Sequence, residues 1–208
     1  MKSTQKILAS LFFGVILIFA SSQSSAQINA GLIGSVGAAT ISNHDGNALR
    51  FGAFNIGAFA TGQVADQVAV EGQLVFANRG DKYDLSMPGI EYDGKLLMNY
   101  VTLVVLMHYM ATENFSFGVG PSVGVLMSAK DKGDATVFGQ TEEYDEDFKD
   151  DAESTQVGVN AELMYKVNED ASVGVTVEKG LTKVWDTPGD TPTSTFFGLV
   201  FKYALVKQ

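Results

Sequence analysis

Residues 115–128 (FSFGVGPSVGVLMS) alternate between two kinds of side chain along their whole length. One set is bulky and apolar: Phe115, Phe117, Val119, Pro121, Val123, Val125 and Met127. The other set is small apart from one leucine: Ser116, Gly118, Gly120, Ser122, Gly124, Leu126 and Ser128. A period of two predicts a long β-strand with an apolar outer face and a tightly filled inner face. Because Pro121 has no N–H to donate, we expect a bulge or a break in pairing there.

The first 26 residues have the pattern of a signal peptide. Lys2 and Lys6 precede an apolar run at 7–20, and small residues follow at 24–26. This order predicts a signal peptide over 1–26 and leaves residues 27–208 as one domain. An uncleaved membrane anchor is the alternative, although the apolar run is short for a spanning helix.

Seven further segments have strand-like alternation or β-branched and aromatic content. They cover residues 28–42, 50–61, 68–82, 96–109, 154–167, 171–181 and 195–206. A buried helix is the alternative for 96–109. Long and short connections alternate between the eight strands. The fold class predicted is therefore all-β, an eight-stranded antiparallel up-and-down transmembrane β-barrel whose short turns face the periplasm.

Two of the long connections carry most of the turn signals and charge. Residues 83–95 contain Pro88-Gly89 and Asp93-Gly94 and are expected to form a loop, with a small hairpin as the alternative. Residues 129–153 are expected to be the longest loop. From 131 to 153 this loop holds ten acids and two lysines, a charge of −8. The simplest interpretation of residues 129–153 is a solvated surface loop.

The distribution of charge favours a membrane barrel over a soluble one. The polar strand faces hold mainly Gly, Ser, Thr, Asn and Gln, which suit the filling of a narrow lumen. Aromatic residues near the strand ends are typical of interfacial girdles. Four are expected at the periplasmic rim and two at the outer rim: Tyr109, Phe115, Tyr165 and Tyr203, then Tyr83 and Trp185. We therefore predict the outer membrane of a Gram-negative bacterium. A soluble lipocalin-like ligand-binding barrel stays open as an alternative.

Net charge limits the partners. The chain has a formal charge of −10, which becomes −12 if Lys2 and Lys6 leave with the signal peptide. Such a chain is a poor nucleic-acid binder, because phosphate contacts need Lys and Arg. The expected partners are outer-membrane lipid and envelope or extracellular proteins that contact the acidic loop. There is no cysteine in the sequence, so disulfides do not contribute.

Strand parity places a set of polar side chains in the lumen. The predicted lumen network, with a structural role, comprises Glu71, Gln73, Arg79, Tyr100, His108, Glu162, Lys166, Glu178 and Lys202. Three acids and three bases balance, and charges in a narrow lumen must be paired. The balance favours a plugged lumen over a selective pore.

The candidate chemical sites are sparse. His44 lies beside Ser42 and Asp45, and His108 lies near a strand end, so a barrel enzyme acting on lipid or peptide is an alternative function. Asp145, Asp147 and Asp150 form a possible weak cation site, without the glycine and terminal glutamate of an EF-hand loop. We predict no catalysis, no cofactor and no resident metal.

Several stretches of the mature chain resemble the porT-like outer-membrane β-barrel family common in Bacteroidetes. They are Ala30-Gly31-Leu32, 72–80 (GQLVFANRG), 99–109 (NYVTLVVLMHY), 118–128 and Lys179-Gly180-Leu181. In the family the second stretch reads like P-E-L-x-Y-S-x-K-G and the third like N-Y-L-E-I-P-L-L-L-K-Y. The resemblance implies a barrel rather than a particular chemistry, and a place beside a secretion or adhesion machine of the envelope.

The chain departs from the family pattern at several lumen positions. Gln73 and Thr102 stand where the family has glutamate, Val104 where it often has proline, and His108 where it often has lysine. These departures predict a weaker charge pairing between the third and fourth strands. The chain ends in Leu205-Val206-Lys207-Gln208, beyond the terminal aromatic typical of barrel assembly signals, a role that Tyr203 would fill from inside. The function predicted is a small plugged barrel with a structural or interaction role at the cell surface.

Overall fold

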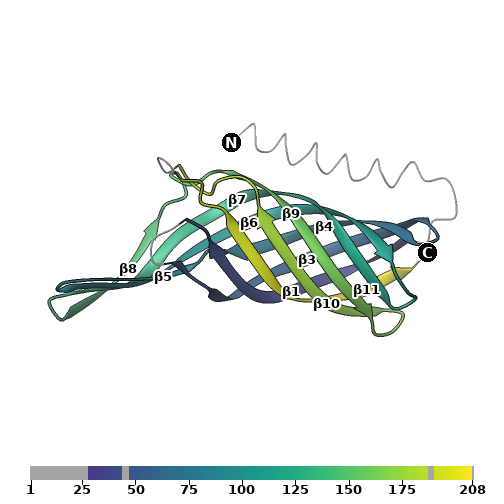
Figure 1. The fold of residues 1–208 in the computed structure, drawn as a ribbon, viewed down its shortest axis with the longest axis horizontal. Helices are drawn as coiled ribbons and strands as arrows, with labels where there is room; N and C mark the ends of the chain where they lie inside the picture. Colours follow the sequence, from purple (N-terminus) through teal and green to yellow (C-terminus); the bar gives the residue numbers. More distant parts are fainter. Residues whose placement is uncertain (1–27, 44–46, 187–189, 208) are drawn as a thin grey trace.

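A computed structural model describes residues 28–43, 47–186 and 190–207 as an almost purely β-structure. Eight strands pair in the order β6-β4-β3-β1-β11-β10-β9-β7, and β7 pairs back to β6, so the sheet closes into a ring (Figure 1). Three further strands, β2, β5 and β8, extend the sheet at one end. No helix in the described ranges is long and apolar enough to cross a membrane. The predicted signal peptide at 1–26 lies outside the described residues and stays a prediction.

The strands run as follows. They are β1 Ile28–Ile41, β2 Asn47–Ala48, β3 Arg50–Ala65, β4 Val68–Arg79, β5 Lys82–Met87, β6 Ile90–Met110, β7 Phe115–Val137, β8 Gln140–Asp147, β9 Thr155–Lys166, β10 Ala171–Gly180 and β11 Ser194–Lys207. Every pairing is antiparallel. The eight-stranded antiparallel barrel is therefore confirmed, including the strand rather than the helix over 96–109.

The two faces of the barrel wall are distinct. Outward-facing apolar side chains are exposed around the whole ring, among them Leu32, Ile56, Leu74, Met107, Phe117, Val159, Val175 and Leu199. Their alternate neighbours are buried in the lumen. An apolar exposed belt around a closed ring is the pattern of a transmembrane barrel, in which lipid covers the belt and no strand edge is left unpaired. Val125 is an exception, because it belongs to the outward set and is only 5% exposed.

The pairing of β6 with β7 closes the ring and shows the break expected at Pro121. The register runs from Val104↔Ser122 to Met107↔Val119, with no pairs recorded between them. On the other side of β7, Pro121 stays in register with Val159. The only register shift in the β6–β7 pairing lies elsewhere, at Asn99/Tyr100. Proline therefore interrupts one ladder and leaves the other intact.

Small residues on the inner face of β7 make room for large ones opposite. A methyl group on Gly118 would overlap the His108 ring, and one on Gly124 would touch Thr102 and Tyr100. At Gly120 it would overlap the backbone carbonyl oxygen of Val105. The glycines thus allow the close approach of β6 and the seating of bulky lumen side chains.

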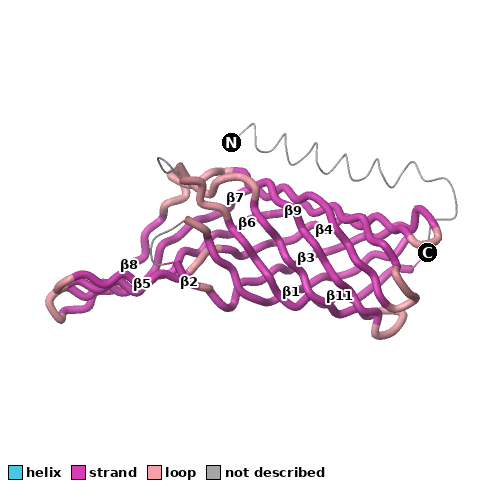
Figure 2. The backbone as a smooth tube through the Cα atoms, viewed as in Figure 1, coloured by secondary structure: helices cyan, strands magenta, loops and turns pink. Residues whose placement is uncertain are grey.

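The predicted loops at 83–95 and 129–153 are largely strands, which corrects the sequence interpretation. β5 and the start of β6 form one hairpin, and the end of β7 and β8 form another. Because β6 and β7 stay paired out to Ile90↔Val137, the two hairpins make one four-stranded sheet that projects beyond the barrel (Figures 1 and 2). We call this extension the hairpin sheet. The small hairpin considered as the alternative for 83–95 is present and runs from Lys82↔Lys95 to Met87↔Ile90.

The connections at the same end pack on one another. Phe148 meets Trp185 edge to face, with ring centroids 6.4 Å apart, and Ala152 forms an isolated bridge with Trp185. The amide of Glu153 donates to the carbonyl of Val184. These contacts fix residues 148–153 against the segment after β10, so the acidic segment is ordered at both ends.

The facing of β7 gives a direct test. We expect Gly120→Trp to prevent folding, because the side chain would collide with the β6 backbone. The matched control is Val119→Trp, which adds the same group on the lipid-facing side. Heat-dependent gel mobility in detergent measures barrel closure. A normally folded Gly120→Trp protein would contradict the inward position of Gly120.

Candidate functional site: the charged lumen and the hairpin sheet

Glu71, Glu162 and Lys202 form the centre of a buried polar network in the lumen. The Lys202 ammonium donates to Glu71 Oε1 at 2.5 Å and to Glu162 Oε2 at 2.6 Å. Gln73 Nε2 donates to the same two carboxylates, at 2.7 Å and 2.9 Å. Thr61 Oγ1 donates to Glu71 at 2.8 Å. The carboxylates are thereby bridged by one cation and one amide.

Strands from different parts of the ring supply these side chains. Glu71 and Gln73 alternate on β4, Glu162 lies on β9 and Lys202 on β11. Each is 3–5% exposed. Because the barrel has only eight strands, side chains from opposite walls meet across the lumen. The network is therefore a cross-brace between walls that are far apart in sequence.

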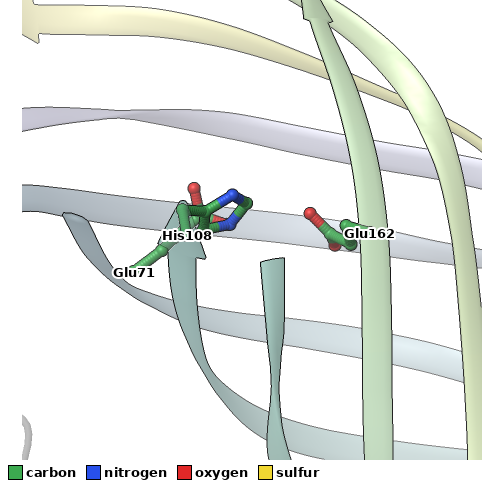
Figure 3. Close-up of side chains that lie close together, drawn as sticks. All are labelled: Glu71, His108 and Glu162. Atoms are coloured by element: carbon green, nitrogen blue, oxygen red, sulfur yellow. The ribbon is translucent and has the colours of Figure 1, made fainter. Parts of the chain in front are cut away.

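Glu71, His108 and Glu162 resemble a metal-binding group. Each offers one ligand atom, and these atoms lie within 4.8 Å of one another (Figure 3). This is the one such group found among the described residues. However, the Lys202 ammonium already bonds to both carboxylates. The position that a cation would take is filled by the ammonium group of Lys202, which offsets part of the free-energy cost of burying the carboxylates.

Arg79 organises a second polar layer nearer the hairpin sheet. Its guanidinium pairs with Glu178 at 2.5 Å and donates to Asn55 Oδ1 at 2.7 Å. It also lies 4.3 Å from the centroid of the Phe196 ring. Arg79 is 1% exposed. A carboxylate, an amide and an aromatic face contact this buried cation, while its Nε–H has no hydrogen-bond partner among the described residues.

The remaining predicted lumen residues occupy different depths. Tyr100 is buried, and its hydroxyl contacts Met98 Sδ at 3.7 Å. His108 is buried, with Nε2 3.8 Å from Glu71 Oε1 and no hydrogen-bond partner in the described part of the chain. Lys166 differs from the expectation, because it is exposed at the mouth of a cavity of about 300 Å³. Glu71, His108 and Lys202 also line that cavity.

The alternative catalytic constellations do not assemble in the described residues. His44 and Asp45 lie outside them, so that pairing stays a prediction. Ser42 instead bonds to Thr193, with the hydroxyls 2.9 Å apart. Around His108, no serine hydroxyl bonds to the ring within the described chain, and Gly118 lies against it. A nucleophile–base pair needs such a hydrogen bond.

The expected cation site at Asp145, Asp147 and Asp150 is not formed. Asp145 lies on β8 and accepts from Lys132 at 2.7 Å and Lys130 at 3.2 Å. Asp147 caps a turn by accepting from the Lys149 amide at 2.9 Å. Asp150 lies beyond β8 and is exposed. Strand structure spreads these carboxylates, which a loop would have been free to gather.

A cluster that sequence analysis missed straps the hairpin sheet. Tyr83 on β5 and Tyr144 on β8 place their hydroxyls 2.5 Å apart over Gly94 and Gly133. Tyr83 also donates to Asp131 at 2.7 Å. The register Tyr83↔Gly94↔Gly133↔Tyr144 explains this, since two glycines leave room for two rings. The sequence signal for this cluster is the pairing of a tyrosine with a glycine on the neighbouring strand, which can be recognised only when the register is known.

Electrostatics in the hairpin sheet follow its ion pairs. Burial and the hydrogen bond with Tyr144 raise the pKa of Tyr83. Lys132 lowers the pKa of Asp145, and Asp93 raises the pKa of Lys82. These shifts keep Tyr83 protonated and keep Lys82 and Asp145 charged near neutral pH. The strap is therefore a neutral hydrogen-bonded unit inside a charged sheet.

A closed ring with an apolar exterior and a paired, charged interior defines the class of transmembrane antiparallel β-barrels. The family model of the outer membrane protein beta-barrel domain matches residues 13–186. The chain therefore belongs to this family, and its location is the Gram-negative outer membrane. The short turns between strands lie at one end of the barrel and the hairpin sheet lies at the other (Figure 1).

Solved structures with a similar chain path are also outer-membrane barrels. The attachment invasion locus protein Ail of Yersinia pestis is 16% identical, with 88% of this chain and 100% of that chain covered and a TM-score of 0.46. Neisserial surface protein A is 10% identical, with coverage of 86% and 97% and a TM-score of 0.42. The N-terminal barrel domain of Pseudomonas aeruginosa OprF is 14% identical, with coverage of 87% and 100% and a TM-score of 0.36. A search of curated proteins gave no match.

Removal of the central cation tests the lumen network. We expect Lys202→Met to destabilise the folded barrel by about 3–5 kcal/mol, because two buried carboxylates lose their ammonium. The matched control is Lys166→Met, which removes an exposed lysine from the same cavity and should change stability by less than about 1 kcal/mol. Urea unfolding in lipid vesicles, followed by Trp185 fluorescence, measures both. Equal stabilities would show that the network is not a brace.

Proposed function

We propose that this barrel has a plugged lumen and serves at the cell surface as a non-catalytic interaction protein, with the hairpin sheet as its contact surface. The observation that carries the proposal is the hairpin sheet itself. It continues four strands beyond the apolar belt and is strapped by Tyr83 and Tyr144. The hairpin sheet thereby presents a hydrogen-bonded surface beyond the part of the wall that lipid covers.

The tip of the hairpin sheet has the character of a binding surface. Phe138 is 87% exposed, and Met87 and Val137 are also exposed. The Phe138 ring lies against Gly89 in the neighbouring turn, so the two hairpin tips form one apolar patch. Exposed apolar groups that are rimmed by charge mark contact sites. Positive φ at Phe138 and Gly139 holds the turn that presents this ring.

The charge of the free edge of the hairpin sheet, at β8, predicts the charge of the partner. β8 has no strand on its far side in the described chain. Its residues 140–147 include five acids: Glu142, Glu143, Asp145, Glu146 and Asp147. Charged edges oppose self-association of strands. A partner that approaches β8 is therefore expected to carry basic residues.

Plugging of the lumen is supported by the two polar layers. Lys202 bridges Glu71 and Glu162, and Arg79 pairs with Glu178, so each carboxylate of the two layers has a cationic partner inside the wall. Tyr100 and Met98 add apolar bulk to the same interior as buried members of the core. Absence of catalysis is also part of the proposal, and it is supported by the lack of a hydroxyl bonded to His108 among the described residues. Membership of the porT-like subfamily is supported by the sequence resemblance at 72–80 and 99–109.

Electrical recording tests the plug. In planar bilayers we expect the protein to show no large steady conductance, because paired side chains fill the lumen. A variant with Glu71, Glu162 and Lys202 all changed to alanine should conduct measurably more. Lys166→Ala is the control and should stay silent. Large steady conductance of the unaltered protein would refute the plugged lumen.

Crosslinking in intact cells tests the contact surface. We expect a photoreactive amino acid at Phe138 to give a discrete higher-mass adduct, and one at Glu113 in the opposite, periplasmic turn to give a different adduct or none. Neutralising β8 by Glu142→Gln, Glu143→Gln and Glu146→Gln should weaken the Phe138 adduct several-fold. If the Phe138 adduct is absent, or is unchanged by neutralisation of β8, the proposed contact surface is wrong.

A further inference from the structure

The outward face of β4, β6 and β7 changes character at a row of polar side chains. Asn78 Nδ2 donates to Asn99 Oδ1 at 2.7 Å, and Asn99 Nδ2 donates to Ser128 Oγ at 2.9 Å. Arg50 donates to Asn78 Oδ1 at 2.5 Å. Below this amide row, the outward positions of β4 and β6 are apolar, as at Phe76 and its partner Val101. The amide row therefore marks the outer boundary of the hydrocarbon region.

Beyond the amide row, the same outward face carries a row of lysines. Lys82 lies directly opposite Lys95, and Lys95 lies directly opposite Lys132, on three neighbouring strands. Like charges in such positions repel. Lys82 pairs with Asp93 at 3.2 Å and with Asp84 at 3.7 Å, and Lys132 shares Asp145 with Lys130. Lys95 has no ion pair among the described residues and supplies the uncompensated positive charge of the row.

The lysine row lines a hollow with an apolar base. A cavity of about 430 Å³ is bordered by Arg50, Lys82, Lys95 and Lys132, by Asp93 and Asp134, and by Leu49 and Phe51. Its four basic and two acidic side chains give it a charge of +2 in a chain whose charge is −10. Phe51 is 78% exposed and belongs to the apolar belt. A ligand at this place meets positive charge and hydrocarbon contact together.

The order of charges along the strands points the lysines toward the membrane. Lys95 lies four residues beyond Asn99, or about 13 Å along the strand. The next row outward is acidic and runs Asp84↔Asp93↔Asp134↔Glu143. An anion in the plane of the membrane headgroups meets the lysines first, and long lysine side chains reach toward that plane. An anion that arrives from solution meets the acidic row first.

We infer that Lys82, Lys95 and Lys132 form a binding site for the phosphate groups of outer-leaflet lipid, with the acyl chains against Phe51 and Leu49. The site rests on the outward orientation of the hairpin sheet in the proposed function. Lipid held there anchors the base of the hairpin sheet at the membrane surface. The acidic edge at β8 is left free for a protein partner.

Lipid titration of the folded full chain in detergent tests the site. The probe is a bis-phosphorylated lipid A, and bound lipid is counted by native mass spectrometry. The triple variant Lys82→Gln, Lys95→Gln and Lys132→Gln should bind lipid A about 100-fold more weakly. The matched control, Lys166→Gln, Lys179→Gln and Lys207→Gln, changes net charge equally and should bind as the unaltered chain does. Lys95→Gln alone should weaken binding about fivefold, which provides a test if the triple variant fails to fold.

The other arms separate the competing explanations. Lipid A without phosphates should bind as weakly to the unaltered chain as lipid A does to the triple variant. If inorganic phosphate displaces lipid A at equal concentration, the site is one for a free anion and the inference is overturned. Equal weakening in both triple variants would assign the effect to bulk charge and also overturn it. Persistence of the Phe138 crosslink in the triple variant would show that the proposed function stands independently of the lipid site.

Discussion

The pairing of β6 with β7 is the constraint on which the rest of the structure depends. In hydrocarbon every backbone N–H and C=O must find a partner within the protein, so a sheet of this kind has to close. β6 and β7 make that closure, and they also continue as the centre of the hairpin sheet. One ladder therefore holds both the membrane ring and its extension. The ladder tolerates an interruption at Gly120 and Pro121 because β7 stays fully paired with β9 there.

Closure at eight strands leaves a narrow lumen, and this determines which residues the inner face can hold. Glycines on β7 accept the rings of His108 and Tyr100 from β6. Charges enter the lumen only as bridged sets, around Lys202 and around Arg79. Removing one charged residue is expected to lower the stability of the fold by more than the whole set contributes to it, because the remaining charges would be buried and unpaired. The lumen is consequently braced from several strands at once.

The sequence predicted the barrel, its strand count and its facing, because lipid on one side and a filled lumen on the other impose a period of two. The period-two pattern did not identify the strands at 129–147. Neither face of the sheet meets lipid there, because each faces water or the aromatic strap, so apolar and polar side chains no longer alternate. Strand parity also placed Lys166 on the correct face of the wall but at the wrong depth in the lumen. An alternating pattern gives the face of a side chain and not its distance from the mouth of the cavity. The strap of Tyr83 and Tyr144 depends on the register of four strands, which no single stretch of sequence contains.

A change in the chemistry of the outward face, from apolar to charged, connects the two parts of the molecule. Within the barrel, β6 turns apolar residues such as Val101 and Leu103 outward. Beyond Asn99 it turns Lys95 and Asp93 outward, and Leu96 and Tyr92 join the inner cluster. The strand itself continues through this point, with a single register shift between Asn99 and Tyr100. A one-residue shift exchanges the faces of one strand relative to its partner, so a bulge is suited to the level where the solvent changes from lipid to water. The amide row, the bulge and the first lysines therefore lie close together, because all three occur at the level where the surroundings change from lipid to water.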